Sequence, residues 1–267
     1  MDKSIDIRGR KLGGETPLIC TPLVGKTREG VLAEAATVIA KKPDVIEWRV
    51  DHRRRVSDGV EMIDAIGDTA TVIDAGRALR AAVGDTPIIF TRRSVKEGGA
   101  PIAIDDEGVV RLYDAVGAAG IVDFLDFEMG NDAGHVRRVR DDARRHGVRT
   151  ILSYHNFKDT PGHEFLVQRF VEAERLGGDV AKVAVMPVHR KDVLTLLAAT
   201  AEADDRTRIP LISMSMGPLG AVTRMVGGLF GSSLSFAVGS ASSAPGQMPI
   251  ADLDAVYEVI RRARGGK

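Results

Sequence analysis

The sequence predicts an α/β protein that forms a single (β/α)₈ TIM barrel. Eight short apolar runs alternate with longer segments of helical spacing, as the strands and crossover helices of a parallel sheet do. A chain of 267 residues also has the size of one such barrel. The first apolar run is not followed by the Gly-rich turn of an open dinucleotide-binding sheet, which favours the closed barrel.

The eight apolar runs are near-continuous and rich in Val and Ile, which is typical of strands covered on both faces. Pro87 and Pro210 stand at or near strand starts, where a missing N–H is tolerated. The first 14 residues fit none of the eight units, and we expect them to form a small hairpin that closes the barrel floor. In chain order the predicted strands are Pro17–Val24, Asp44–Val50, Pro87–Arg93, Asp123–Met129, Arg149–Asn156, Val180–Met186, Ile209–Met216 and Ser233–Val238.

The segments between these runs carry apolar residues at three- and four-residue steps, which predicts amphipathic helices. Gly120, Gly147 and Gly177 follow three of them, where a helix C-terminus favours glycine. No linker, low-complexity tract or shift in composition marks a second domain, so we expect one domain over residues 1–267. The predicted helices are Arg28–Lys41, Ala75–Val83, Val109–Ala119, His135–His146, Glu164–Leu176 and Lys191–Ala203.

Composition excludes several classes of protein. The chain is 44% hydrophobic and 28% charged, as globular proteins are. Its 37 basic and 37 acidic residues balance, so we expect neither a nucleic-acid nor a membrane partner. One cysteine, Cys20, excludes an internal disulfide and a cysteine-based zinc site. The polar N-terminus and the lack of a long apolar run predict a cytoplasmic enzyme or binding protein.

Ionisable residues stand in or directly after five consecutive predicted strands, where apolar residues are expected. Chemistry in such barrels gathers at the carboxyl ends of the strands. Residues two apart share one side of a strand, so Glu47 and Arg49 can both face the lumen. Any one pair could be a structural ion pair, but burying charge in five strands is costly and usually has a use. The set comprises Glu47, Arg49, Arg92, Arg93, Glu97, Asp126, Glu128, His155 and Lys182.

Lys182 is the most informative of these residues, because apolar residues flank it on both sides within its strand. Desolvation disfavours the ammonium form of such a lysine. A neutral amine is a nucleophile that can form a Schiff base with a ketone or an aldehyde. The structural alternative is a lysine whose ammonium group reaches the barrel mouth.

His155 ends the preceding strand, so its side chain could reach over the same lumen as Lys182. Histidine is the usual general acid–base near neutral pH. A lone histidine is more often structural, but a strand-buried lysine beside it favours a catalytic role. The other five histidines lie in predicted loops or helices.

Two glycine-rich segments follow the last two predicted strands. The first contains one cation, Arg224, and the second contains Ser243 and Gln247. Gly-rich loops at this position of a barrel often bind anions. The glycines could equally permit tight turns only, and the loop Ser242–Gln247 could be an active-site lid.

These pieces together resemble the type I 3-dehydroquinate dehydratases over nearly the whole chain. SYHNF, AKVAVMP and SAPGQ are far more specific than a generic barrel pattern. The resemblance implies a (β/α)₈ barrel that uses neither a metal nor an organic cofactor and forms a homodimer. The other matching pieces are GRKLGGETPLICTPLVGKT, IEWRVD, IIFTRRSVKEGG, LDFEM, KDTP, SMSMGPLGAVTR, FGSSLSF and SAPGQMP.

The resemblance also implies roles for individual residues. Lys182 matches the Schiff-base lysine of the family, and His155 matches its general acid–base histidine. Arg224 matches the arginine that binds the substrate carboxylate. The residues that match other substrate-binding positions are Glu47, Arg49, Arg93, Ser243 and Gln247, with Glu97 at the KEGG position.

The chain departs from the family pattern at two places. Many relatives carry SLMG in strand one, where this chain has TPLVG, so a serine contact is lost or replaced by Thr21. The strand-three motif often reads TFR or TWR, and Arg92 stands here in place of the apolar or aromatic residue. Neither the role of Arg92 nor those of Asp126 and Glu128 follow from the sequence.

The implied activity is dehydration of 3-dehydroquinate to 3-dehydroshikimate, a step of the shikimate pathway and of aromatic amino acid biosynthesis. The same step serves quinate breakdown, and the sequence does not distinguish the two. Two alternatives stay open from the residues alone. A class I aldolase also uses a strand-six lysine, and a barrel without catalysis could bind a carboxylate metabolite.

Overall fold

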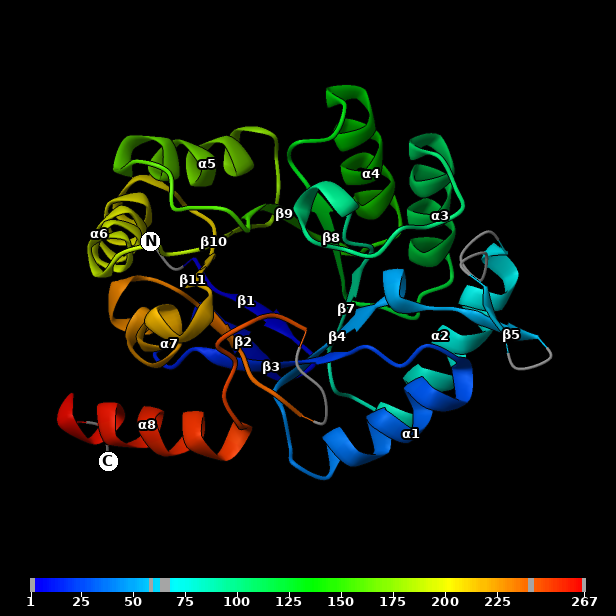
Figure 1. Cartoon of the computed structure of the whole chain (residues 1–267), viewed down its shortest axis with the longest axis horizontal. Coiled ribbons are helices and arrows are strands. Elements are labelled where there is room, and N and C mark those ends of the chain that lie inside the picture. The colour runs from blue at the N-terminus through cyan, green and yellow to red at the C-terminus, as the bar shows by residue number, and fades with distance from the viewer. Residues whose placement is uncertain (1–2, 58–59, 63–67, 240–242, 266–267) are drawn as a thin grey trace.

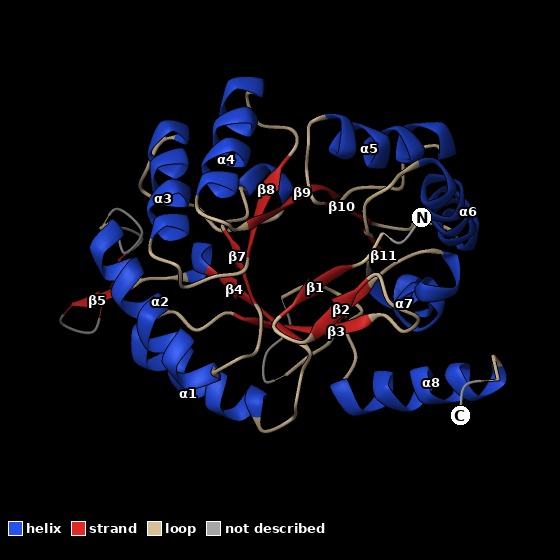
Figure 2. Ribbon diagram, turned by 180° about the vertical axis from the view of Figure 1, so that it is seen from behind, coloured by secondary structure: helices blue, strands red, loops and turns tan. Residues whose placement is uncertain are grey.

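The eight predicted strands form one parallel sheet that curls into a nearly closed barrel (Figures 1 and 2). The computed structural model describes residues 3–57, 60–62, 68–239 and 243–265. The strand order is β11-β10-β9-β8-β7-β4-β3-β12, and one bridge between Leu211 and Ser232 links the two ends. This confirms the predicted fold class. The strands are β3 Leu18–Leu23, β4 Val45–Arg49, β7 Ile88–Thr91, β8 Phe124–Glu128, β9 Arg149–Asn156, β10 Val180–Val185, β11 Leu211–Ser215 and β12 Leu234–Phe236.

Eight helices surround the barrel, two more than the segments predicted. The helix α2 begins at Thr69, six residues before its predicted start, because the side chain of Asp68 caps it by accepting from the N–H of Ala70. Among the described residues, three short 3₁₀ turns lie in the connections: η1 (Val50–His52), η3 (Val95–Glu97) and η4 (Gly227–Phe230). The helices are α1 Arg28–Ile39, α2 Thr69–Val83, α3 Asp106–Ala118, α4 Ala133–Arg145, α5 His163–Arg175, α6 Arg190–Arg206, α7 Gly217–Val226 and α8 Ile250–Ala263.

The N-terminal segment forms the predicted hairpin across the barrel floor. Its strands, β1 (Ile5–Ile7) and β2 (Arg10–Leu12), are antiparallel and joined by Arg8 and Gly9. Both turn residues have positive φ, 44° and 76°, as a two-residue turn of this hand requires. Leu12 packs into the lumen cluster of apolar side chains, so the hairpin seals that end. A second hairpin, β5 Arg55–Ser57 with β6 Val60–Met62, was not predicted.

Side chains alternate along each strand between the helix layer and the lumen. Trp48 and Phe90 belong to the layer under the helices and meet edge to face, with ring centroids 5.6 Å apart. Val180 and Ala184 belong to the lumen cluster, so Lys182 between them also points into the lumen. Apolar residues fill the lower lumen, which leaves the carboxyl ends of the strands for polar side chains. Within the part of the chain that the structure describes, no helix has the length and apolar character to span a membrane.

Candidate active site

Lys182 lies at the centre of a buried polar cluster in the upper lumen. Its Nζ is 2.8 Å from Asp126 Oδ2 and 3.4 Å from Glu47 Oε1. The same nitrogen lies 4.6 Å from the centre of the Phe236 ring, and the lysine side chain is 4% exposed. The apolar flanks of Lys182 predicted an apolar surrounding, whereas the barrel brings two carboxylates to its amine from β4 and β8.

Arg93 is the second cation of this cluster, directly after β7. Its guanidinium donates to Asp126 Oδ1 at 2.8 Å, to Ser153 Oγ at 2.9 Å and to Glu128 Oε1 at 3.2 Å. Burial opposes its charge, but Asp126 and then Glu128 outweigh burial and raise the pKa of Arg93. Burial likewise opposes a charge on Asp126, yet Arg93 and Lys182 hold the pKa of its carboxyl well below the usual range.

These contacts define the positions of Asp126 and Glu128, whose roles the sequence left open. Asp126 lies between the two cations and also accepts a hydrogen bond from Ser153 Oγ at 2.6 Å. Glu128 accepts from the backbone N–H of Ser94 at 2.6 Å and so holds the chain after β7. Both carboxylates therefore organise cations and backbone around the lumen.

His155 faces the same space from the end of β9. Its ring Nδ1 and its backbone N–H both contact Glu97 Oε2, at 2.8 and 2.9 Å. Burial, followed by the positive charges of Arg93 and Lys182, lowers the pKa of His155 well below its ordinary value. Burial raises the pKa of Glu97 to about 8, against the opposing effect of Arg93. With Nδ1 engaged by Glu97, the ring has Nε2 available for proton transfer.

Gly98 allows the loop that carries Glu97 to pass beneath Phe157. Its φ is 84°, and a Cβ at this position would lie 2.4 Å from a carbon of the Phe157 ring. Any residue with a side chain would therefore displace either Phe157 or the loop. The geometry of the loop therefore requires Gly98, the first glycine of the KEGG segment.

Arg49, at the end of β4, is held by a residue that the sequence did not single out. Its Nε and Nη2 donate to the two oxygens of Asp51, each at 2.9 Å. Asp51 is fully buried and also accepts from the backbone N–H groups of Arg93 and Ala100, at 3.3 and 3.2 Å. Asp51 thereby connects the end of β4 to both ends of the loop that carries Glu97. The signal in the sequence that could have identified Asp51 was its position two residues after Arg49.

Seven of the eight predicted site residues line one small cavity. The cavity holds about 40 Å³, little more than one water molecule occupies in the liquid. Ser243 N–H donates to Gln247 Oε1 at 3.1 Å and Gln247 Nε2 donates to Ser243 Oγ at 3.2 Å, which closes the loop on itself. Ser242, the first residue of the predicted lid, lies outside the described residues. The lining residues are Glu47, Arg49, Arg93, Glu97, Gly98, His155, Phe157, Lys182, Ala184, Met214, Met216, Phe236, Ser243, Ala244 and Gln247.

Arg224, the eighth predicted residue, lies behind this wall, on α7. Its guanidinium contacts Met214 Sδ at 3.6 Å and the backbone oxygens of Phe236 and Pro245 at 3.4 and 3.2 Å. Arg224 is 1% exposed, its Nε has no hydrogen-bond partner, and no carboxylate among the described residues pairs with it. Burial lowers the pKa of Arg224 to about 10. An unpaired buried guanidinium beside a cavity is suited to receiving an anion.

The two departures from the family pattern lie outside the cavity. Thr21 is fully buried on the helix side of β3, because its neighbour Cys20 packs in the lumen. The serine contact that many relatives have is therefore not replaced by Thr21. The backbone N–H of Arg92 donates to the hydroxyl of Tyr113 at 3.0 Å, and Arg92 Nε is buried without a partner. We find no contact that explains the Arg92 side chain.

The sequence missed the apolar residues of the cavity wall, Phe157, Met214, Met216 and Phe236. Apolar residues in buried strands carry no signal that separates a cavity wall from a core. Among the described residues, no group of three or more His, Cys, Asp or Glu side chains is placed to hold a metal ion.

Comparison with known proteins gives a consistent result. Residues 19–264 match the family model described as Type I 3-dehydroquinase. The 3-dehydroquinate dehydratase of Albidiferax ferrireducens is 50% identical over 98% of this chain and 96% of its own length. That of Geobacillus thermodenitrificans is 48% identical over 97% and 96%.

Solved structures agree with this result. The 3-dehydroquinate dehydratase of Geobacillus kaustophilus superposes with a TM-score of 0.91 at 43% identity, over 97% of both chains. The type I enzyme of Clostridium difficile, solved with covalent modified comenic acid, also has a TM-score of 0.91, at 32% identity over 98% of this chain and 100% of its own.

Proposed function

Since this chain belongs to the type I 3-dehydroquinase family, we propose that it dehydrates 3-dehydroquinate to 3-dehydroshikimate through a Schiff base on Lys182. The observation that supports the proposal is that one amine and one imidazole line the same small cavity. The Lys182 amine supplies a nucleophile and the His155 ring supplies an acid–base group. The covalent modified ligand of the Clostridium difficile relative supports covalent chemistry.

The reaction begins when the Lys182 ammonium gives up a proton to the neutral His155 ring. The free amine then adds to the substrate ketone, and the ketone oxygen leaves as water with protons supplied by His155 and the amine. The resulting protonated imine is a stronger electron sink than the ketone, so the adjacent C–H becomes more acidic. Asp126 and Glu47 hold the amine in place for this addition.

His155 then removes the adjacent proton, and the electron pair moves into the imine system. The hydroxyl group β to the imine carbon leaves as water, with the proton returned by His155. Addition of one water to the imine releases the ketone product and the free lysine, so the net change is the loss of one water. Because burial lowers the pKa of His155, the ring is neutral near pH 7 and able to accept the proton.

Substrate binding is assigned to the other predicted residues. Arg224 would bind the carboxylate, because its buried guanidinium has no carboxylate partner among the described residues. Glu47, Arg49 and Arg93 line the cavity and would orient hydroxyl groups. The cavity of about 40 Å³ is too small for a substituted ring, so Ser243 and Gln247 must move for the substrate to enter.

Borohydride reduction tests the Schiff base. With 3-dehydroquinate present, reduction should inactivate the enzyme and add the mass of the ligand at Lys182. Lys182→Arg is the matched control, because it keeps the charge and should take no adduct. An adduct on another lysine, or full activity after reduction, would rule out the assignment. The aldolase alternative predicts an aldehyde product, and no relative reported above favours it.

The remaining proposals concern context. We take residues 1–267 as one domain that acts in the cytoplasm, in the shikimate pathway and aromatic amino acid biosynthesis. The relatives' shared coverage of nearly the whole chain supports the single domain. A growth test decides the pathway: the gene should restore growth without aromatic amino acids to a strain that lacks this dehydratase.

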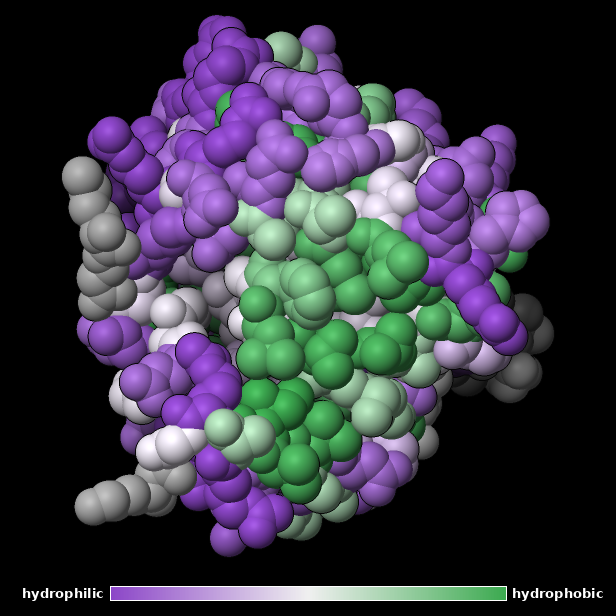
Figure 3. Space-filling view, turned by 90° about the vertical axis from the view of Figure 1, so that its left-hand side faces the viewer, coloured by the Kyte–Doolittle hydropathy of each residue, from purple (hydrophilic) through white to green (hydrophobic). Residues whose placement is uncertain are grey.

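The proposed homodimer has a candidate surface. Figure 3 shows a continuous apolar region on the side formed by α6, α7 and α8. Leu194 on α6 and Leu219 and Val222 on α7 are 65%, 44% and 42% exposed. Exposed apolar patches of this kind often mark protein interfaces. Sedimentation should give a dimer for the wild type and a monomer for Leu219→Asp, with Val95→Asp, an exposed apolar residue of η3, as the control.

A further inference from the structure

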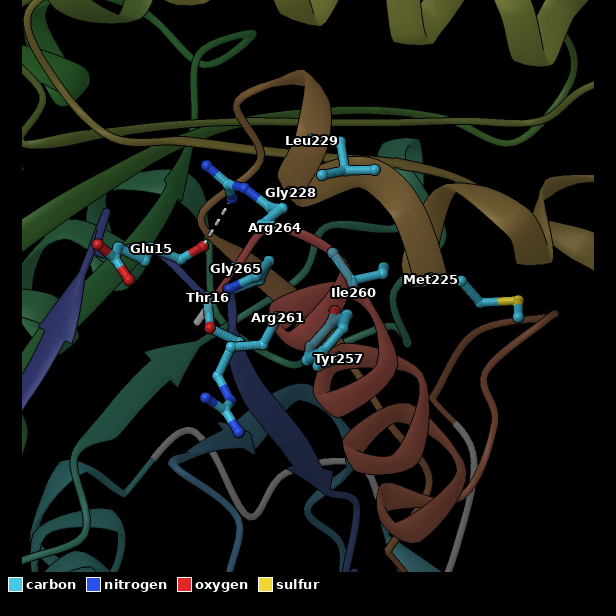
Figure 4. Close-up of a pocket in the computed structure, with 11 residues that line it drawn as sticks. Glu15, Thr16, Met225, Gly228, Leu229, Tyr257, Ile260, Arg261, Arg264 and Gly265 are labelled. Carbon is cyan, nitrogen blue, oxygen red and sulfur yellow. Dashed lines mark hydrogen bonds between the residues drawn. The ribbon is translucent and has the colours of Figure 1, made fainter. Parts of the chain in front are cut away.

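A second pocket lies at the floor of the barrel, at the opposite ends of the strands from the candidate active site (Figure 4). It is open to solvent on one side and is lined by the segment Glu15–Pro17 that leads into β3, by η4 and by the last turns of α8. Its volume is about 220 Å³, the space of roughly seven water molecules in the liquid. A small ring with one substituent fits this space.

The walls of this floor pocket are apolar and aromatic on one side. Figure 4 shows Tyr257 and Ile260 next to each other on α8, with Leu229 above them. Met225, at the end of α7, also lines the pocket. Tyrosine rings and methionine sulfur both make favourable contacts with aromatic rings, so the wall is suited to an aromatic ligand.

The polar side of the floor pocket carries a guanidinium. Among the described residues, the Arg264 side chain has one hydrogen-bond partner, the backbone oxygen of Glu15 at 3.3 Å, and no carboxylate (Figure 4). Arg261 is already bonded to Glu258, at 2.8 and 3.0 Å, so it adds little net charge. A guanidinium has five N–H donors, and its fork matches a carboxylate.

The position of Arg264 limits the charge of the ligand. It follows the C-terminal end of α8, where the helix dipole adds partial negative charge. Among the described residues no α-helix begins at this pocket, and the short 3₁₀ turn η4 supplies the lining residues Gly228 and Leu229. The site is therefore suited to a monocarboxylate and not to a phosphate dianion.

The floor pocket is also connected to the candidate active site through Tyr257. The Tyr257 ring lines the pocket, and its hydroxyl donates to the backbone oxygen of Arg224 at 2.8 Å. Met225, the next residue after Arg224, lines the pocket as well. The Arg224 side chain reaches in the other direction, to the backbone oxygens of Phe236 and Pro245. A molecule bound against Tyr257 and Met225 would therefore contact the segment that holds Arg224 and could shift it.

We propose that the floor pocket binds a small aromatic monocarboxylate between Arg264 and Tyr257, and that its occupation weakens substrate binding by displacing Arg224. The proposal that the pocket binds this ligand depends on the geometry of the pocket alone. The coupling half rests on the proposed role of Arg224 as the carboxylate-binding residue. Coupling between two sites requires only that the ligand prefers one arrangement of the shared segment.

Binding is tested with benzoate as the probe, followed by NMR or calorimetry. Benzoate should bind the wild type and Arg224→Met alike, whereas Arg264→Gln should bind it about tenfold more weakly or not at all. Arg262→Gln is the matched control, because Arg262 is exposed on the same turn, as Arg264 is, but does not line the pocket. Benzamide, which lacks the charge, should bind poorly. Absence of benzoate binding, or binding lost in Arg224→Met but kept in Arg264→Gln, overturns the proposal.

Coupling is tested by the effect of benzoate on KM for 3-dehydroquinate. The KM of the wild type and of Arg262→Gln should rise about fivefold at saturating benzoate, and that of Arg264→Gln should not change. Tyr257→Phe should still bind benzoate but show a smaller rise. A rise that persists in Arg264→Gln would indicate competition at the active site and refute the coupling. If Arg224→Met leaves KM unaltered without benzoate, Arg224 does not bind the substrate carboxylate. The calorimetry then still tests the floor pocket separately.

Discussion

One carboxyl oxygen, Glu97 Oε2, accepts a hydrogen bond from the backbone N–H of His155 at 2.9 Å and also lies 2.8 Å from the ring Nδ1 of the same residue. The double contact sets both the position and the rotation of the imidazole. It links two segments that lie 58 residues apart, the loop after β7 and the end of β9. The ring that we propose as the proton-transfer group is thus held by a residue that does not need to touch the substrate.

His155→Ala should be well folded but slower by about 10²–10⁴-fold in kcat, the usual contribution of an acid–base group. His155 stands at the end of β9, beside a cavity, so removing its ring leaves the barrel core intact. Circular dichroism and steady-state kinetics check the two halves. His146→Ala, at the end of α4, is the control for turnover. Unfolding of the His155 variant, or near-normal turnover, would refute the role.

Glu97→Gln should change how stability depends on pH. Burial raises the pKa of Glu97 from 4.5 to about 8 on folding. A group whose pKa is raised on folding contributes stability that is complete below the unfolded pKa and is lost as pH rises through the folded pKa. The wild type therefore loses this contribution between about pH 4.5 and 8, whereas glutamine has no proton to lose. The melting temperature of Glu97→Gln minus that of the wild type should increase over this range.

Glu164→Gln, at the exposed start of α5, is the matched control and should give a difference that does not vary with pH. A constant difference for Glu97→Gln would show that its carboxyl is not protonated in the folded state.

Arg224→Ala should raise KM and lower kcat/KM more than Gln247→Ala, because a charged fork fixes a carboxylate more strongly than an amide orients a hydroxyl. Arg224→Met isolates the charge. Burial without a carboxylate partner is unfavourable for the guanidinium, so this variant should melt at the same temperature as the wild type or higher. Kinetics and thermal melts are measured on the same samples. A lower melting temperature with unchanged kinetics would mean that Arg224 only stabilises α7.

Asp51→Asn should weaken substrate binding through two other residues. An amide cannot accept the paired donors of Arg49 and also the backbone N–H groups of Arg93 and Ala100. Breaking a buried pair of this kind costs about 3–5 kcal/mol, so the melting temperature should fall. KM should rise as Arg49 loses its orientation, and Asp51→Glu should restore part of it.

Asp106→Asn, at the exposed start of α3, is the control for Asp51. The kinetic readout separates positioning from stability. If Asp51→Asn melts lower but keeps its KM, then Asp51 holds the fold and does not position Arg49.

The local sequence determined the architecture. Each strand is a short run of apolar residues, and such a run indicates a strand that is buried on both faces. All eight strands therefore lie within their predicted ranges. Side chains alternate between the two faces of a strand, so the neighbours of Lys182 in its own strand were enough to predict that it faces the lumen. The resemblance assigned roles to the other seven predicted site residues, six of which share the cavity with Lys182.

Only the tertiary structure decided which residues meet. The contact between Lys182 and Asp126 spans 56 positions and that between Lys182 and Glu47 spans 135. Such contacts follow from the register between neighbouring strands and from closure of the ring, which no local pattern encodes. Arg224 illustrates the difference. Its glycine-rich segment was recognisable in the sequence. Its burial without a carboxylate partner among the described residues, and the hydrogen bond from Tyr257 on α8 to its backbone oxygen, result from the packing of α7 against α8 on the barrel.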